Sequence, residues 1–228
     1  MTSFGKKVRG ETNLLDVDFS LAIHNRTGKY FIGQGVIDLL GDQLGSVYYG
    51  SIALSGPPSG LHGRVLGRLQ RWQVMSRTRS QRPRWPRRPR DNRPLLHLDP
   101  FTVPSTELRP GDLVLSHDVG PLTHPNLFDP NVCVAYRAIY SEIAEVGPHL
   151  VFVSDASRRA FHELFPQCEP RSSRVIYPTL RPDVAASVGG VEVSGVRKPF
   201  ILTVGSIGAR KNQERCITAF AASGLAAQ

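Results

Sequence analysis

Residues 112–154, DLVLSHDVGPLTHPNLFDPNVCVAYRAIYSEIAEVGPHLVFVS, decide the fold class of this chain. The apolar runs at 112–118 and 149–154 predict two buried strands, and the longer stretch between them predicts a helix. A strand, a helix and a second strand in this order are typical of a parallel sheet. The stretch therefore predicts an α/β protein.

The helix within this stretch has clear start and stop signals. Asp129 can cap the free N–H groups of the first turn, and Pro130 suits the first helical position. Gly147 and Pro148 end the pattern. Between these signals the apolar residues recur at helical spacing: Val132, Tyr136, Ile139, Ile143 and Val146.

The same alternation extends on both sides of this stretch. Apolar runs at 14–21, 46–54 and 173–178 predict further strands, and SDASRRAFHELFP at 154–166 predicts another helix. We therefore expect residues 12–180 to form one domain with a Rossmann-like parallel sheet.

The chain beyond residue 180 predicts a second domain. Residues 181–199 are rich in Gly, Ser and Val without helical periodicity, which indicates a linker. Residues 200–228 then begin with FILTVGSIGARKNQERCITAF, which predicts a strand, a turn and a helix. One strand and one helix cannot bury both faces of a sheet. We therefore expect a truncated second Rossmann-like domain whose apolar residues are exposed, mobile and prone to aggregation.

The positive charge of the chain is concentrated in one segment. The net charge is +9, but residues 64–93 contain 11 arginines and a single acid, Asp91, so the other residues have 17 cations against 18 anions. The Arg/Pro-rich part, 76–93, predicts disordered or extended structure. A solvated surface insertion and out-of-frame or degraded coding sequence are two interpretations of this segment. A binding surface for anions is the third.

The residues just before the Arg/Pro-rich part favour an anionic membrane as the partner. They predict a helix with an apolar stripe formed by Leu61, Val65, Leu69, Trp72 and Met75. Arg64, Arg68 and Arg71 follow the flank of this stripe. An apolar stripe with adjacent cations is what an interfacial helix requires. Trp85 among arginines would suit nucleic acid, but no known nucleic-acid motif accompanies it, so nucleic acid is the less favoured partner.

Cysteine usage and hydropathy indicate the compartment. The three cysteines, Cys133, Cys168 and Cys216, have no disulfide-framework or metal-ligand spacing, which favours a reducing environment. The N-terminal residues lack the apolar region of a signal peptide, and no apolar run approaches the roughly 20 residues of a membrane span. We therefore expect a cytoplasmic protein, with possible peripheral contact at the inner face of the membrane.

A phosphate-binding turn is the first candidate site. Gly205 ends the predicted strand, and Arg210 and Lys211 stand near the start of the following helix. Free N–H groups and the positive end of a helix dipole attract anions, and the two cations would hold a diphosphate. An ordinary surface Arg-Lys pair fits the pattern equally well.

The predicted carboxyl edge of the sheet supplies two more candidates. His117 directly follows a strand, where it could hydrogen-bond a substrate hydroxyl or phosphate, or simply cap the strand. Arg26, Thr27 and Gly28 form a loop after the first strand that could contact phosphates or an acceptor, although a tight βα turn explains them as well. The glycines of this loop lack the spacing of a dinucleotide fingerprint, so we expect no NAD site.

The sequence offers no convincing metal site. Asp16 and Asp18 form an Asp-x-Asp pair, but apolar neighbours place them inside the first predicted strand. His124 follows His117 without cysteine or carboxylate ligands at suitable spacing. We therefore expect neither a metal nor another cofactor.

Several of these motifs together resemble one enzyme family. HDVGPLTHPNLFDPNV, VFVSDASRRAFHELFP and PFILTVGSIGARKNQERCITAF, in this order, closely resemble glycosyltransferase family 4, and NRTGKYF resembles the first-loop pattern of that family. The resemblance covers about residues 12–54 and 111–221. It implies a retaining, metal-independent hexosyltransferase of the GT-B fold, which has two facing Rossmann-like domains, and residues 12–180 would be its acceptor-side domain.

The resemblance also implies roles for the candidate residues. Arg210 and Lys211 would hold the diphosphate of a GDP- or UDP-sugar, with mannose the favoured hexose, and His117 would contact the transferred sugar. The loop at Arg26–Gly28 would lie near the phosphates and the acceptor, a glycan or a lipid-linked sugar. Lys29 stands where the family more often has a hydrophobic residue or glycine.

One departure from the family limits the expected activity. Family members have two glutamates eight positions apart in the second domain, and no two glutamates of this chain have that spacing. We therefore expect the chain as printed not to be a competent transferase. A basic protein that binds anionic membrane or nucleic acid through residues 61–93 is the alternative function.

Overall fold

The computed structural model describes residues 14–24, 28–78, 86–179, 195 and 200–225. The predicted linker at 181–199 lies outside these residues, apart from Gly195. So do Arg26, Thr27 and Trp85.

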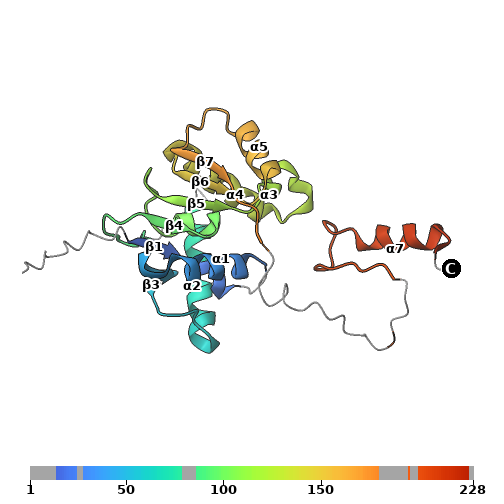
Figure 1. Ribbon diagram of the computed structural model, residues 1–228, viewed down its shortest axis with the longest axis horizontal. Helices are drawn as coiled ribbons and strands as arrows, with labels where there is room; N and C mark the ends of the chain where they lie inside the picture. The colour runs from blue at the N-terminus through green and yellow to red at the C-terminus, as the bar shows by residue number, and fades with distance from the viewer. Residues whose placement is uncertain (1–13, 25–27, 79–85, 180–194, 196–199, 226–228) are drawn as a thin grey trace, which may run out of the picture.

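One seven-stranded sheet organises the fold, in the order β3-β2-β1-β4-β5-β6-β7 (Figure 1). All neighbouring strands are parallel except β2 and β3, which form an antiparallel pair. The strands are β1 (Leu15–Asp18), β2 (Leu44–Tyr49), β3 (Ile52–Ala53), β4 (Leu95–His97), β5 (Leu113–Ser116), β6 (His149–Phe152) and β7 (Ser172–Val175). The chain leaves β1 toward β2 on one side and returns to β4 on the other, so the order reverses at β1.

Helices connect the parallel strands. The α-helices are α1 (Gly28–Leu40), α2 (Gly60–Thr78), α3 (Gly120–Thr123), α4 (Pro130–Val146), α5 (Asp155–Leu164) and α7 (Gln213–Ala222). Short 3-10 helices are η1 (Ser20–Ile23), η2 (Gly41–Gln43), η3 (Pro100–Ser105) and η4 (Pro125–Leu127). None of the helices in the described ranges is both long enough and apolar enough to cross a bilayer.

The core consists of two clusters, one for each face of the sheet. On one face, Val114, Leu150 and Phe152 pack with residues of α4 and α5. On the other, Val17, Leu96 and Leu115 pack with partly buried residues of α1. Covering both faces of a parallel sheet with helices is the Rossmann-like arrangement, so the predicted α/β class is confirmed.

The decisive stretch folds as its sequence predicts. The Asp129 side chain accepts a hydrogen bond from Asn131 N (2.8 Å), so it caps α4. Gly147 ends this helix with φ = 63°, a left-handed conformation that favours glycine. Ile139 is 1% exposed and Ile143 is fully buried, which confirms that the periodic face of α4 is a core face.

Two details of the sheet differ from the prediction. The single strand expected at 46–54 is two strands, because the chain turns at Gly50, where φ is 68°. Strand β4 was not predicted at all. It has only three residues, and they follow the Arg/Pro-rich part directly, where no periodicity could identify them.

Residues 86–93 are extended, which is one of the two structures predicted for 76–93, but the interpretation as a solvated surface insertion does not hold for them. This part lies beside the end of η3, where Arg88 N donates to Ser105 O (2.8 Å). Arg90 forms two hydrogen bonds to the buried Asp112 carboxylate, at 2.6 and 2.7 Å. Further ion pairs join Arg87 to Glu142, Arg88 to Asp18 and Arg93 to Asp16. The reason is electrostatic, since carboxylates buried at the sheet require cations nearby.

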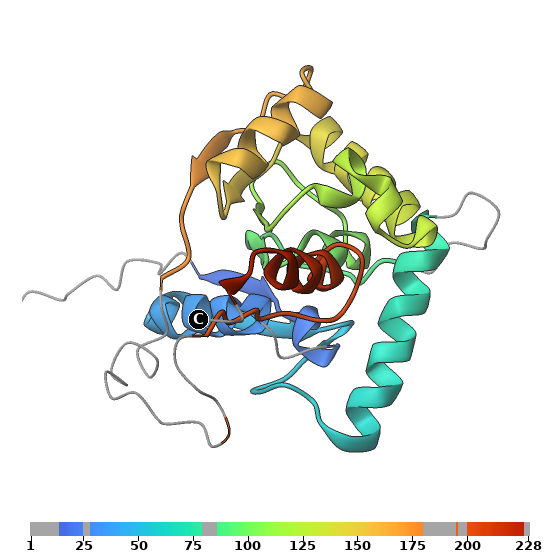
Figure 2. The same ribbon diagram turned by 90° about the vertical axis from the view of Figure 1, so that its right-hand side faces the viewer.

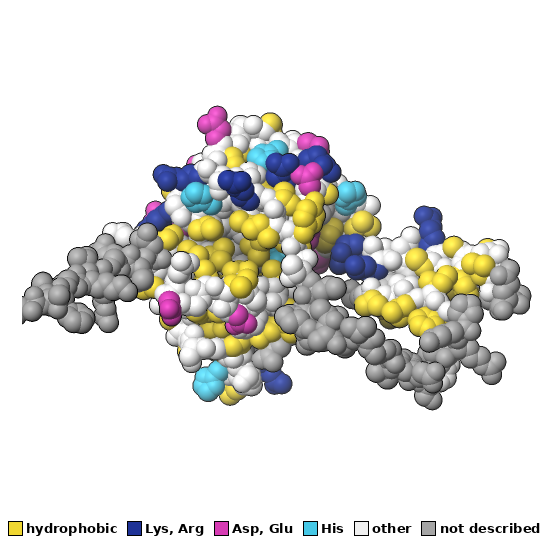
Figure 3. Space-filling model, viewed as in Figure 1, with side chains coloured by type: hydrophobic (Ala, Val, Ile, Leu, Met, Phe, Trp, Pro, Cys, Tyr) yellow, Lys and Arg dark blue, Asp and Glu magenta, His cyan; other side chains and the backbone are white. Residues whose placement is uncertain are grey.

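The segment 200–225 matches its prediction only in part. Helix α7 forms, but residues 200–204 are not a strand, because no neighbouring strand accepts their backbone hydrogen bonds. The expected exposure of its apolar residues is confirmed, with Ile201, Leu202 and Val204 each at least 70% exposed. Figure 3 shows apolar side chains gathered on the surface of this segment.

Candidate functional site

The carboxyl ends of β1 and β4 meet where the strand order reverses. Open α/β sheets bind ligands in the crevice at such a point. Strand β4 is followed by Asp99, whose side chain accepts a hydrogen bond from Phe101 N (2.9 Å) and so caps η3. Lys29 in the first turn of α1 forms an ion pair with Asp99, with Nζ 2.8 Å from Oδ2. A cation and a buried carboxylate therefore stand at this crevice.

His117 lies beside this pair, at the end of β5. Its Nε2 is 3.0 Å from the backbone oxygen of Leu98, and the side chain is buried. Burial lowers the pKa of His117, and the nearby positive charge of Lys29 lowers it further. The imidazole is therefore neutral at physiological pH. The neighbouring Asp118 accepts a hydrogen bond from Gly120 N (3.0 Å), which fixes the loop after β5.

A pocket of about 650 Å³ opens at this edge of the sheet. Its polar wall includes Lys29, Asp99 and Asp129, and its apolar wall includes Phe101 and Tyr136. Such a mixture of apolar surface with a few polar groups is typical of small-molecule sites.

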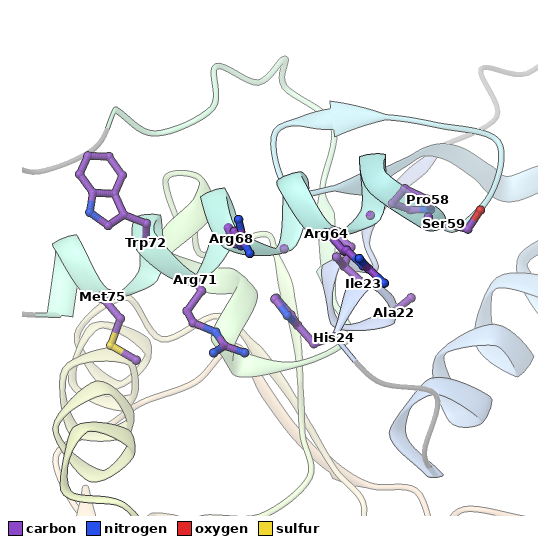
Figure 4. A pocket seen from close by; sticks show the side chains of 13 residues that line it. Ala22, Ile23, His24, Pro58, Ser59, Arg64, Arg68, Arg71, Trp72 and Met75 are labelled. Carbon is purple, nitrogen blue, oxygen red and sulfur yellow. The ribbon is translucent and has the colours of Figure 1, made fainter.

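A second pocket, of about 810 Å³, lies between α2 and η1 (Figure 4). We call it the α2 groove. Its lining residues are Ala22, Ile23, His24, Pro58, Ser59, Gly60, Gly63, Arg64, Gly67, Arg68, Arg71, Trp72 and Met75. His24, Arg71 and Met75 line both pockets, so the α2 groove and the sheet-edge pocket are adjacent.

The predicted apolar stripe of α2 lies on the surface. Leu61 is 74% exposed, and Val65, Leu69 and Trp72 are each between 44% and 48% exposed. The opposite face of α2 is buried through small or polar residues, among them Gly63, Gly67 and Gln70. The three predicted arginines, Arg64, Arg68 and Arg71, stand between the buried face and the stripe.

The predicted phosphate turn is exposed, and its two cations do not lie in the helix that follows it. Helix α7 begins at Gln213, so Arg210 and Lys211 precede it instead of occupying its first turn. Gly205 has φ = 154°, and the Gln213 side chain donates to Ser206 O (2.8 Å), which closes the turn. The guanidinium of Arg210 lies 5.8 Å from the centre of the Phe128 ring.

The predicted site residues are therefore distributed over two regions. His117 and Lys29 lie at the sheet edge, and Arg210 contacts Phe128, whose ring packs against Gly120 in the loop after β5. Gly28 begins α1, with open space around its Cα. Arg64, Arg68, Arg71 and Trp72 form the other region, the α2 groove.

Asp99 and His24 were missed by sequence reasoning. The sequence Leu98-Asp99-Pro100 contains the same Asp-Pro capping signal as Asp129-Pro130, so Asp99 could have been found by it. His24 has no comparable signal. Its Nε2 donates to Gln70 Oε1 (2.6 Å), and burial lowers its pKa.

Comparisons with protein-family models, with curated proteins and with solved structures found no match to this chain. In the part of the chain that the structure describes, no three His, Cys, Asp or Glu side chains are grouped so that they could hold a metal ion. Both Asp16 and Asp18, the two acids of the Asp-x-Asp pair, instead face arginines.

Proposed function

We propose that residues 12–180 are the acceptor-side domain of a retaining hexosyltransferase, and that residues 200–228 are the beginning of its donor-binding domain, of which the structure describes helix α7. The observation that carries the proposal is the sheet edge, where His117, Lys29 and Asp99 gather beside a pocket at the reversal of strand order. The Arg210 contact with Phe128 supports it, because it brings a cationic turn to the loop after β5.

Each of these groups has a chemical task in the proposed reaction. Arg210 and Lys211 would neutralise the diphosphate of a GDP- or UDP-hexose as it departs, and retaining transfer depends on such electrostatic stabilisation. His117 would hydrogen-bond the transferred sugar, for which we favour mannose. The sheet-edge pocket would hold the acceptor, a glycan or a lipid-linked sugar.

We expect GDP-mannose or UDP-glucose to bind the chain once it is extended by the remaining strands and helices of a GT-B donor-binding domain, and the double variant Arg210→Ala/Lys211→Ala, extended in the same way, to bind at least tenfold more weakly. A hydrogen bond to a charged group contributes about 1.5–3 kcal/mol, which is about tenfold or more in affinity. Isothermal titration calorimetry measures the dissociation constants.

Arg174→Ala is the matched control for this titration, because Arg174 is an exposed arginine on β7 at the far edge of the sheet. Its affinity should equal that of the unmodified chain. The transferase proposal fails if neither nucleotide sugar binds, or if the double variant binds both as tightly as the control.

A second candidate function is the binding of anionic membrane through α2. It is favoured by the exposure of Leu61, Val65, Leu69 and Trp72 on one side of the arginines. In an interfacial helix the apolar stripe enters the acyl boundary while the cations contact lipid phosphates. This function does not exclude the first, since lipid-linked acceptors lie in membranes.

We expect Leu69→Glu to weaken binding to phosphatidylglycerol-containing vesicles by about tenfold or more. Transfer of the leucine side chain from water into the bilayer contributes about 1.5–3 kcal/mol, and the variant loses this contribution. It also introduces a negative charge that anionic lipid repels. Trp72 reports binding through a blue shift of its fluorescence in a Trp85→Phe background, which removes the second of the two tryptophans.

The control for the vesicle experiment is Leu39→Glu. Leu39 is an 88% exposed leucine on α1, so the same substitution there should leave vesicle binding unchanged. Equal losses for both variants, or tighter binding to a single-stranded RNA oligomer than to the vesicles, would argue against the membrane function.

A further inference from the structure

One border of the α2 groove is the line along which α2 approaches η1 very closely. A Cβ on Gly67 would lie 3.1 Å from Ile23 Cγ2, and a Cβ on Gly63 would lie 2.9 Å from the backbone oxygen of Pro58. Because glycine has no side chain, α2 can pack directly against Ile23 and Pro58 at these two positions. The helix side chains that line the groove therefore come from the adjoining turns, from Arg64 to Met75 (Figure 4).

Among the described residues, the arginines of the α2 groove have no ion-pair partner. Arg64, Arg68 and Arg71 occupy positions i, i+4 and i+7, so neighbouring arginines are separated by about 4.5–6 Å along the helix axis. No residue in the described ranges forms an ion pair with any of the three, and no Asp or Glu lines the groove. This distinguishes them from the arginines at 87–93, which pair with carboxylates of the fold.

Apart from the arginines, the groove is lined mostly by apolar residues, with His24 and Ser59 as its polar members. Ile23 and Pro58 come from outside α2 and lie against it, whereas Trp72 and Met75 belong to its last turns, where they point to opposite sides of the helix (Figure 4). Guanidinium groups bind phosphate oxygens bidentately, whereas these side chains offer surface to a hydrocarbon chain. A ligand that satisfies both walls has an anionic head and an apolar tail.

The groove also leads to the sheet-edge pocket, because His24, Arg71 and Met75 line both. The sheet-edge pocket in turn contains Lys29 and Asp99. A molecule whose phosphate is held by the arginines could therefore extend a polar group toward Lys29 and Asp99 in the sheet-edge pocket.

We propose that the α2 groove binds a single amphiphilic phosphate ester, with its phosphate on Arg64, Arg68 and Arg71 and its hydrocarbon chain against Ile23, Trp72 and Met75. The binding itself follows from the groove alone. Only the role of this ligand as the sugar acceptor rests on the proposed transferase function. A lipid and a water-soluble phosphate compound both contain the phosphate ester that the arginines would bind. The hydrocarbon chain is the part that distinguishes the lipid from the water-soluble compound.

The test uses three soluble probes and no nucleotide sugar, so its outcome is independent of donor binding. Dihexanoyl phosphatidic acid, below its micelle-forming concentration, supplies both head and chains. Glycerol 3-phosphate supplies the head alone, and dihexanoyl phosphatidylcholine supplies the same chains with a zwitterionic head. Calorimetric titration of the full chain should show the first probe binding at least tenfold more tightly than either of the others.

Variants locate the binding in the groove. Arg68→Gln should weaken dihexanoyl phosphatidic acid binding by about tenfold or more, because it removes a charged hydrogen-bond donor to the phosphate. Arg174→Gln removes the same charge from β7 and should have no effect. Leu69→Glu should also leave this soluble probe unaffected, since Leu69 is not a lining residue, which separates the groove from the vesicle-binding stripe.

Three results would overturn the proposal. Equal affinity for glycerol 3-phosphate would show a plain anion site, and equal affinity for dihexanoyl phosphatidylcholine would show an apolar site without phosphate recognition. Equal losses in Arg68→Gln and Arg174→Gln, with both variants folded by circular dichroism, would place the binding elsewhere.

Discussion

Replacement of Arg88 by methionine should lower the free energy of unfolding by about 3–5 kcal/mol, the usual cost of removing one partner from a buried ion pair. Arg88 and Asp18 are both buried, with Nη1 3.4 Å from Oδ2. The same Nη1 donates to Gly50 O (2.7 Å), and the guanidinium lies 3.7 Å from the centre of the Tyr48 ring. The variant would therefore remove the cation for Asp18, a donor for Gly50 and a ring contact together.

Urea unfolding followed by circular dichroism measures this loss. Arg174→Met is the control, because Arg174 is exposed on β7, and a surface substitution there should change stability by less than about 0.5 kcal/mol. Adding Asp18→Asn to Arg88→Met should recover part of the loss, since it removes the unpaired buried charge. A loss below about 1 kcal/mol for Arg88→Met would show that residues 86–93 do not stabilise the sheet.

The second large effect concerns His97 and acid. Burial lowers the pKa of His97 to about 3, whereas the imidazole of an unfolded chain has a pKa near 6.5. The unfolded state therefore binds an additional proton between these two values, so stability falls as the pH falls below about 6.5. The loss is about 1.4 kcal/mol for each pH unit, or about 3 kcal/mol by pH 4.5.

The measurement compares unfolding free energies at pH 7 and pH 4.5 in unmodified chain and in His97→Gln. Between pH 7 and pH 4.5, the free energy of unfolding of His97→Gln should fall by about 3 kcal/mol less than that of the unmodified chain. This difference does not depend on the stability of the variant at pH 7. His62→Gln, at an exposed histidine of α2, should behave like the unmodified chain. Asp18 acts in the opposite direction, because burial raises its pKa, but it contributes equally to all three proteins. Parallel pH profiles for His97→Gln and unmodified chain would contradict the prediction.

The elements that the sequence could predict are those whose signals are local. The ends of α4 are set by Asp129 and Gly147, and both act on backbone groups within their own turn. Helix α5 likewise begins at Ser154, whose Oγ accepts from Ser157 N (3.1 Å). Periodicity and capping suffice for such elements, because no distant residue is needed to form them.

The elements that escaped prediction depend on distant partners. Strand β4 is held between β1 and β5, and its three residues carry no period of their own. The ion pair between Arg93 and Asp16 joins residues 77 positions apart. Nothing in the composition of 76–93 distinguishes an arginine that neutralises a buried carboxylate from one that faces water. The basic composition of 76–93 therefore predicted a surface segment, whereas the arginines in about half of it form ion pairs with carboxylates of the folded domain.

The candidate site was predictable to a similar degree. His117 could be placed at the carboxyl edge because a strand precedes it, and the structure puts it there. The close approach of α2 to η1 could not be foreseen, because Gly67 indicates it only once the neighbouring element is known.

The hydrogen bond from His117 to Leu98 has a consequence for ligand choice. A backbone carbonyl only accepts, so Nε2 must carry the proton of the neutral ring, and Nδ1 has only a lone pair. A ligand atom that meets Nδ1 must therefore bring its own hydrogen. Sugar hydroxyls satisfy that condition and ionised phosphate oxygens do not, so this histidine would discriminate between the two halves of a nucleotide sugar.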